Sequence, residues 1–306
     1  DVDGDGARDP EEFIAETAGN YEPIYGLFTS FQPVRDASIG LRTVMDFSRG
    51  PFSRARLLRD LAFEVSLESE RRTSPDVSIG IAPPSLIGFT DEEGLMSARR
   101  SVRSTLHLFR RRTIGSIRID SRLSDDLDRR LSEDGRTKVR EWVFVGKVRP
   151  SRGWDTELRV ETGARRRAGK GAFAHNIAER GLEVRNWVRL PDGWQTGLTI
   201  GWGRDRERQR DLHARRISIG PELRRALRGR GRLTSRFDWV RVTSDDPLPL
   251  FLGLAQGHRK GVNYRWRFGV DYRLGAYVDA FMTYDATIRP ERPALHVGRV
   301  EIRASF

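Results

Sequence analysis

The sequence predicts an all-β fold, an antiparallel transmembrane up-and-down β-barrel of about 13–14 strands, preceded by a short acidic N-terminal segment. Three observations lead to this prediction. Apolar and polar residues alternate with a period of two along most of the chain, which is the mark of a strand with two different faces. The alternating segments are about 9–11 residues long, the length that crosses a bilayer at a tilt. All seven tryptophans fall within these segments or at their ends, as in the aromatic girdles of membrane barrels.

Composition narrows the alternatives. The 306 residues contain no cysteine, which excludes disulfides and thiolate zinc sites. The mean hydropathy is −0.58, and no run approaches the ~18 apolar residues of a transmembrane helix, so a helical membrane protein is excluded. Asp1 opens the chain without an initiator methionine or a signal peptide, a start that is typical of a processed or truncated chain.

Residues 1–30 are predicted to form a separate acidic segment with a candidate calcium loop and a short helix. The stretch DVDGDGARDPEE has the spacing of the twelve-residue EF-hand loop, with glycine at the sixth position. Arg8 and Pro10 depart from the EF-hand pattern and no entering helix is visible, so the stretch more closely resembles the calcium-binding aspartate repeats of exported bacterial proteins. A flexible acidic leader without calcium is the alternative. The candidate ligands are Asp1, Asp3, Asp5, the carbonyl of Ala7, Asp9 and Glu12.

The predicted barrel, residues 31–306, contains thirteen alternating segments. In the clearest of them, NYRWRFGVDYRL, Tyr264 and Trp266 alternate with Arg265 and Arg267. A large soluble β-domain is the less favoured alternative, because soluble strands average about five to six residues. Bacterial barrels usually have an even number of strands, so a further strand is expected, either upstream or within 72–95, where a long loop is the alternative. The thirteen segments are 38–47, 61–69, 102–109, 114–123, 139–148, 154–164, 181–190, 194–202, 215–223, 231–240, 263–274, 276–288 and 296–306.

The polar face of these segments is heavily charged, so we expect it to face the lumen, since charges that face lipid are costly. Arginines and carboxylates nearly balance on this face, and opposite charges on neighbouring strands attract. The sequence therefore predicts a mesh of ion pairs that stiffens the interior, with a selective ion path as the alternative. Its predicted members in the last three segments are Arg265, Arg267, Asp271, Arg273, Asp279, Asp285, Arg299, Glu301 and Arg303.

The chain ends with HVGRVEIRASF, an alternating strand that terminates in phenylalanine. This pattern resembles the recognition signal of bacterial outer-membrane β-barrels, which implies that the barrel-insertion machinery reads Val300, Ile302, Ala304 and Phe306; an ordinary apolar last strand is the alternative. The stretch from GVNYRWRFGVDYRL to the C-terminus, together with LHLFRRR and ETAGNYEPI, resembles the C-terminal barrel of a family of large uncharacterised outer-membrane proteins of Bacteroidetes and Gemmatimonadetes. This resemblance implies a location in the bacterial outer membrane and a fold, but no activity.

The net charge of +12 comes largely from arginine runs outside the balanced face. We expect these runs at strand ends and in loops, where solvated loop residues are the simplest interpretation. In an outer-membrane barrel, their planar guanidinium groups would suit the phosphates of outer-membrane lipid or lipopolysaccharide. No helix-turn-helix, RRM or zinc pattern is present, so nucleic acid is not an expected partner. The runs occupy 110–112, 165–167, 204–211 and 224–232.

No catalytic motif accompanies the five histidines: there is no Gly-x-Ser-x-Gly elbow and no HExxH pair. The chain is therefore predicted not to be an enzyme, and calcium is its one candidate cofactor. We expect a membrane anchor or structural module of a larger cell-envelope assembly, whose partners are an upstream domain or envelope proteins. A pore or transport channel for small solutes or an exported substrate is the alternative function.

Overall fold

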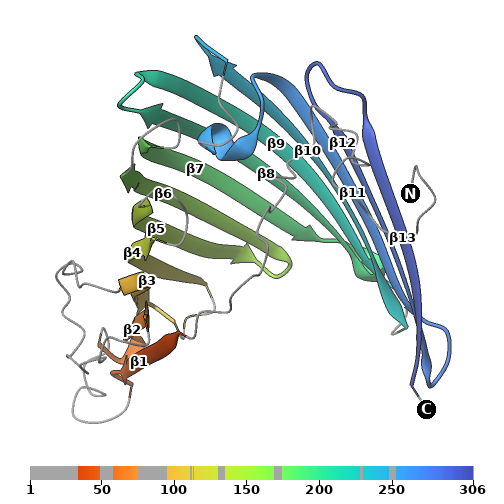
Figure 1. The fold of residues 1–306 in the computed structure, drawn as a ribbon. Coiled ribbons are helices and arrows are strands. Elements are labelled where there is room, and N and C mark those ends of the chain that lie inside the picture. Colours follow the sequence, from red (N-terminus) through yellow and green to blue (C-terminus); the bar gives the residue numbers. More distant parts are fainter. Residues whose placement is uncertain are drawn as a thin grey trace, which may run out of the picture. The chain divides into compact units, whose positions relative to one another are not determined.

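The computed structural model describes residues 34–48, 58–74, 95–110, 112, 114–129, 135–168, 174–227, 230–247 and 253–305. They belong to one unit, Val34–Phe306, and form one sheet of thirteen strands in which each strand pairs with the next one along the chain (Figure 1). The predicted all-β, antiparallel up-and-down fold is confirmed. The acidic segment of residues 1–30 lies outside the described residues, and its boundary with the barrel stays a prediction.

Each predicted segment overlaps one strand, in the predicted order. The described residues also contain three short 3-10 turns, η3 (Leu58–Asp60), η4 (Pro191–Gly193) and η6 (Leu254–Gly257). None of the described helical turns is long and apolar enough to cross a membrane. The strands are β1 (Arg35–Asp46), β2 (Ala62–Thr73), β3 (Leu95–Leu108), β4 (Gly115–Asp128), β5 (Gly135–Ser151), β6 (Trp154–Ala168), β7 (His175–Arg189), β8 (Trp194–Glu207), β9 (Leu212–Ala226), β10 (Gly231–Ser244), β11 (Gly261–Arg273), β12 (Val278–Ile288) and β13 (Leu295–Ala304).

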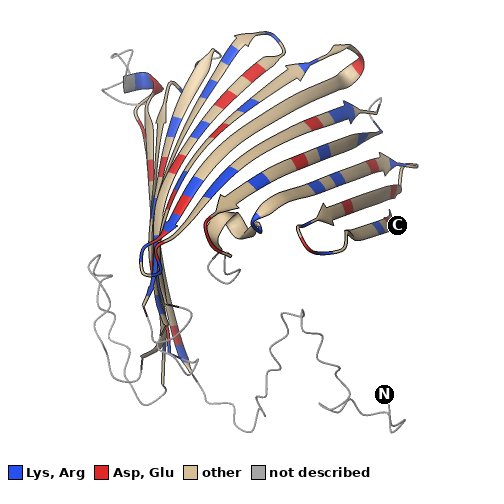
Figure 2. Cartoon of the chain, turned by 90° about the horizontal axis from the view of Figure 1, so that it is seen from above, with Lys and Arg blue, Asp and Glu red and all other residues tan. Residues whose placement is uncertain are grey.

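The register gives the sheet two chemically different faces. Along β8, exposed and buried positions alternate from Thr196 to Glu207. The exposed positions carry Leu198, Ile200 and Trp202, and the alternate positions are mostly glycine, threonine and acidic residues. Directly paired residues lie on the same face, so the register extends this division across the sheet. We call the apolar face outward and the charged face inward; Figure 2 shows basic and acidic residues distributed along the strands.

Several strands are longer than their predicted segments. β8 continues past Trp202 to Glu207, and β6 continues past Ala164 to Ala168. The added residues belong to two of the arginine runs that were expected at strand ends and in loops, so these runs lie partly within the sheet. Backbone pairing does not depend on side-chain polarity, so the ladder extends beyond the apolar stretch by which the segments were recognised.

The two ends of the strands carry different connections. Bacterial barrels have short periplasmic turns and longer external loops. We therefore call one end, at which β13 finishes, the turn end, and the other the loop end. Connections at the turn end include 152–153, 190–193, 227–230 and 274–277, and those at the loop end include 74–94 and 245–260.

Among the described residues the sheet has two free edges. β1 pairs with β2, β13 pairs with β12, and no pairing joins β1 to β13. Consecutive strands are antiparallel and thirteen is an odd number, so β1 and β13 run in the same direction. Closure between them would introduce one parallel pair into an otherwise antiparallel barrel. The sequence predicted an even number of strands and a closed barrel. The described strands are odd in number and do not close.

Candidate functional site

Ion pairs line the inward face, including the C-terminal strands where the sequence predicted a mesh. The guanidinium of Arg265 donates to both carboxylate oxygens of Asp285, the shortest contact being 2.5 Å. Glu301 accepts from Arg299 at 3.0 Å and from Arg303 at 2.5 Å. The other predicted members pair as Arg267–Asp238, Arg232–Asp271 and Arg273–Asp279.

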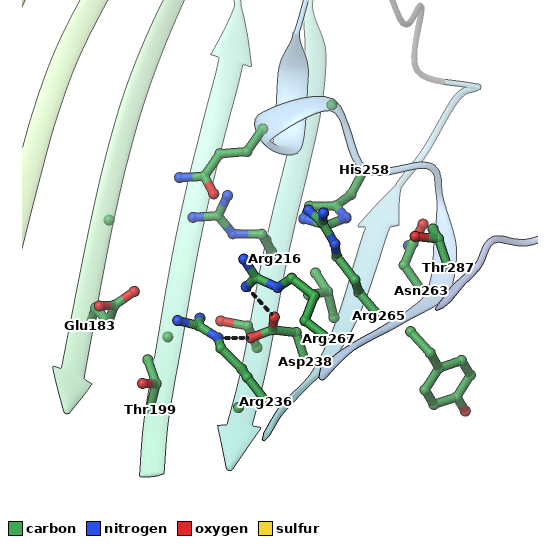
Figure 3. Close-up of a pocket in the computed structure, with 18 of the residues that line it drawn as sticks. Glu183, Thr199, Arg216, Arg236, Asp238, His258, Asn263, Arg265, Arg267 and Thr287 are labelled. Carbon is green, nitrogen blue, oxygen red and sulfur yellow. Dashed lines mark hydrogen bonds and ion pairs between the residues drawn. The ribbon is translucent and has the colours of Figure 1, made fainter. Parts of the chain in front are cut away.

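These pairs are individually weak because most of them are solvated. Arg299 and Arg303 are 74% and 65% exposed, and exposed ion pairs contribute little to stability because water screens them. Shared carboxylates connect them into larger groups: Asp238 accepts from Arg236 at 2.8 Å and from Arg267 at 3.0 Å (Figure 3). The arrangement is suited to holding neighbouring strands in register and to presenting alternating charges to water.

A cavity of about 900 Å³ lies over the inward face, bounded by residues of β6 to β13. Guanidinium and carboxylate groups dominate its wall, and Figure 3 shows Arg216, Arg236, Arg265 and Arg267 grouped around Asp238. Such a lining is suited to water, ions and charged solutes. It is not suited to an apolar ligand, because an apolar ligand would have to desolvate these charges.

The loop between β10 and β11 folds over this cavity through η6. Ala255 donates its backbone N–H to the Asp205 carboxylate at 2.6 Å. The Leu254 and Ala255 side chains are each 2% exposed; Leu254 packs against Ile177 and Leu212, and Ala255 packs in a cluster with Ala214, Val240 and Val242. This apolar contact with buried residues of β7, β9 and β10 holds η6 against the inward face.

The turn that carries this contact has an unusual backbone. Gly253 and Gly257 have positive φ, and so do Ala255 and Gln256 at 51° and 57°. Non-glycine residues in the left-handed region cost about 1 kcal/mol or more each. Strain of this kind persists only where surrounding contacts enforce it, and here the buried Ala255 and its hydrogen bond to Asp205 supply them.

His258 follows η6 and lies at the cavity wall, facing Arg216 and Arg265 in Figure 3. Burial lowers the pKa of His258, and the nearby Arg216 and Arg289 lower it further. The imidazole is therefore neutral at neutral pH, and it adds no positive charge to a wall that is already rich in arginine.

One tryptophan departs from the predicted aromatic girdles. Trp187 lies on the inward face near the turn end, opposite Gly197. Its ring occupies the space that a side chain at position 197 would need, since an added Cβ there would lie 2.7 Å from the ring, and Arg224 stacks on it at 4.4 Å. The ring is therefore packed on the inward face, where it contacts Arg224 through a cation–π interaction and does not contact lipid.

The remaining predicted site residues fall into two groups. Val300, Ile302 and Ala304 lie on the outward face of β13, and Val300 and Ile302 are 73% and 66% exposed. Phe306 and the candidate calcium ligands from Asp1 to Glu12 lie outside the described residues. Within the part of the chain that is described, no group of three or more His, Asp or Glu side chains could hold a metal ion.

The sequence did not reveal the docking of η6 or the role of Asp205. Asp205 stands in the run RDRERQRD, where it looks like one charge among many. The alternation along β8 could have placed Asp205 on the inward face, but nothing local indicates its partner, which lies fifty residues away at Ala255.

No protein-family model matches the chain, and a search of curated proteins returns no match. Solved structures do match. The siderophore receptor PirA of Pseudomonas aeruginosa aligns with 85% of this chain at a TM-score of 0.54 and 13% identity; the chain spans only 40% of that receptor's length. Outer-membrane OmpT of Vibrio cholerae (TM-score 0.42, 8% identity, 89% of this chain and 96% of that one) and the NalP translocator domain of Neisseria meningitidis (TM-score 0.33, 10% identity, 92% and 91%) also match. The chain therefore has the fold of outer-membrane β-barrel proteins.

Proposed function

We propose that this chain lies in the bacterial outer membrane as a structural, membrane-anchoring module of a larger barrel assembly. A membrane location is supported by the outward apolar band of β8, which runs from Trp194 to Trp202 and covers about 26 Å at ~3.3 Å per residue. A tryptophan stands at each end of this band and arginines follow at the loop end, as at a bilayer interface.

The observation that carries this proposal is the pair of edges, β1 and β13, that the described strands leave unpaired. An exposed strand edge inside a bilayer leaves backbone N–H and C=O groups without partners, at a cost of several kcal/mol each. β1 and β13 run in the same direction, so an odd number of additional strands would close the sheet with antiparallel pairs only. The match to two-fifths of the length of PirA agrees with a part of a larger barrel. We propose that strands preceding β1 in a longer chain complete the barrel.

Cysteine cross-linking tests this proposal directly, because the native sequence contains no cysteine. Leu41→Cys in β1 is combined in turn with Gly298→Cys, Val300→Cys or Ile302→Cys in β13, and the refolded chain is oxidised. We expect no intramolecular disulfide in any of these variants, because a disulfide requires Cα atoms within about 7 Å.

Leu41→Cys with Leu67→Cys is the matched control, since these residues are directly opposite one another in β1 and β2. This pair must cross-link in the same refolded protein, because β1 and β2 are paired whether or not the barrel closes. Cross-linking between β1 and β13 at the yield of the control would show that the sheet closes on itself, and the proposal would then be wrong.

A pore or transport channel is the second candidate, and the charged cavity favours it. Arg236, Asp238 and Arg267 present both signs of charge to the space beneath the β10–β11 loop, which is suited to the passage of water and small ions. The docked loop opposes free passage. The single-channel conductance of the Asp205→Ala variant, in which the loop is released, distinguishes the two functions.

Calcium binding by the N-terminal segment stays a prediction, and it has a simple test. Isothermal titration of the refolded chain is expected to show one weak site, with a Kd of about 10⁻⁴–10⁻³ M as in extracellular modules. Replacing Asp5 and Glu12 by Asn and Gln should abolish this heat, whereas Glu11→Gln, at a position outside the ligand pattern, should leave it unchanged. Equal titration curves for all three proteins would count against the loop.

Other expectations also stay predictions. They are kinship with the large outer-membrane proteins of Bacteroidetes and Gemmatimonadetes, recognition of the last strand by the insertion machinery, and association with an upstream domain or envelope protein. All three agree with the fold. The absence of enzymatic activity likewise stays a prediction.

A further inference from the structure

The outward face carries a row of three arginines near the loop end. Arg204 of β8 lies directly opposite Arg180 of β7 on one side and Arg215 of β9 on the other. All three side chains are exposed. Neighbouring strands are about 4.8 Å apart, so three positive charges start from backbone positions within about 10 Å of each other.

This arginine row has no acidic partner. None of the three forms an ion pair with a carboxylate among the described residues, although their strands contain Glu179, Asp205 and Glu207. Those carboxylates alternate with the arginines along the strands and point to the inward face, where Glu179 pairs with Arg165 and Asp205 binds Ala255. The contrast with the inward mesh is direct, because there each of the arginines Arg185, Arg236 and Arg265 pairs with a carboxylate.

More positive charge surrounds the row. Arg166 of β6, Arg140 of β5 and Arg241 of β10 are exposed on the outward face near the loop end. Like charges on directly opposed strand positions destabilise a sheet. A row of three with cationic neighbours is therefore expected to require an external anion to neutralise it.

The depth of the row identifies the kind of anion. One step toward the turn end, the same three strands present Leu182, Trp202 and Ile217, which are paired with one another and 42–48% exposed. The arginines thus stand where the apolar band ends, on the side of the external loops. In the outer membrane this is the headgroup level of the outer leaflet, where the phosphates of the anionic glycolipid lie.

We propose that Arg180, Arg204 and Arg215 form a binding site for the phosphate groups of lipid A, the phosphorylated glycolipid anchor of lipopolysaccharide. The assignment rests on the membrane location proposed above. Guanidinium groups bind phosphate oxygens through paired, charge-assisted hydrogen bonds. Three of them on adjacent strands can hold one phosphate from two or three sides, while Trp202 beneath them contacts the acyl chains. The lipid neutralises the row, and the row positions the lipid against β7, β8 and β9.

The test compares the refolded chain with the variant Arg180→Gln/Arg204→Gln/Arg215→Gln in detergent micelles that contain fluorescent lipid A or its dephosphorylated form. The wild-type chain should bind lipid A about tenfold or more tightly than the dephosphorylated lipid, since each charge-assisted contact adds affinity. The triple variant should lose this discrimination. Raising the salt concentration should weaken wild-type binding, as for other phosphate contacts of exposed cations.

Arg42→Gln/Arg299→Gln/Arg303→Gln is the control, because it removes the same charge from three exposed arginines of the inward face. This variant should keep the discrimination. Equal loss in both triple variants would show that net charge alone governs binding, and would overturn the site. Competition by inorganic phosphate at the concentration of lipid A would show an anion site without a lipid preference, and would overturn the assignment to lipid.

Flotation with vesicles of outer-membrane lipid separates failure of this site from failure of the proposed membrane location. A wild-type chain that floats with the vesicles yet binds both lipids equally overturns the lipid A site alone. A wild-type chain that does not float with them contradicts the membrane location, and the lipid A site falls with it.

Discussion

Replacing Glu207 by alanine is expected to lower the free energy of unfolding by about 3–6 kcal/mol, because two hydrogen bonds to a charged acceptor are lost and each is worth ~1.5–3 kcal/mol. The Glu207 side chain is fully buried at the end of β8. Its carboxylate accepts the backbone N–H groups of Asn176 at 2.8 Å and Arg210 at 2.5 Å, and so ties the β8–β9 turn to β7. Alanine would leave both N–H groups without an acceptor.

Urea unfolding of the reconstituted protein, followed by tryptophan fluorescence, measures this effect. Glu207→Gln should be milder, since its amide oxygen can still accept one hydrogen bond. Glu301→Ala is the exposed control: it removes two ion pairs from solvated arginines, and should change stability far less than Glu207→Ala, because water screens exposed pairs. Equal losses for Glu207→Ala and Glu301→Ala would contradict the role assigned to Glu207.

Replacing Asp205 by alanine is expected to release the β10–β11 loop from the inward face. The variant removes the acceptor of the Ala255 N–H beneath a turn whose backbone is strained at Ala255 and Gln256. If the free energy of docking the loop falls by about 1.4 kcal/mol, the population of the undocked loop rises roughly tenfold. Trypsin cleavage after Arg259 or Lys260 should accelerate by about that factor, measured by mass spectrometry of the cut chain.

Asp205→Asn is the matched control for this prediction, because its amide oxygen can still accept from Ala255. It should keep cleavage near the wild-type rate. An unchanged cleavage rate in Asp205→Ala would show that apolar packing of Leu254 and Ala255 alone holds the loop.

The same variant distinguishes the two candidate functions in planar bilayers. If the inward face lines a pore, Asp205→Ala should raise single-channel conductance over the wild-type chain, because the released loop no longer covers the charged cavity. If the chain is a structural module, inserted protein should stay silent with the loop docked or released. Conducting steps in the wild-type chain itself would argue against the anchoring role.

The strands and their faces could be predicted because both depend on local information. Side chains alternate across a strand with a period of two, so residues such as Trp266 and Arg267 are assigned to opposite faces by position in the chain alone. The presence of ion pairs on the last strands could be predicted, since the sequence pattern placed Arg265, Asp285 and Glu301 on one face. Their particular partners could not, because pairing requires the register of neighbouring strands.

The lengths of the strands were the weakest part of the prediction. Periodic apolar residues mark only the part of a strand that meets lipid, whereas the hydrogen-bonded ladder of β6 and β8 continues through charged residues. Asp205, Glu207 and Arg204 lie in the extension of β8, and Arg180 lies just before the predicted segment of β7. Most residues with clear individual roles were therefore in stretches that sequence patterning treated as loop, whereas Arg215 begins a predicted segment.

The sequence by itself determined that the chain is a series of two-faced strands, which side carries charge, and the order in which the strands occur, because these properties repeat every two residues and connect neighbours in the chain. Only the tertiary structure decided that Arg180, Arg204 and Arg215 meet in one row and that Ala255 reaches Asp205 across fifty residues. It also decided that, among the strands it describes, β1 and β13 are unpaired edges running the same way. Each of these depends on the shift of one strand against another or on the closure of a long loop, and a shift of a single residue would exchange the two faces of a strand. Such contacts arise from the packing of distant segments, which no local pattern encodes.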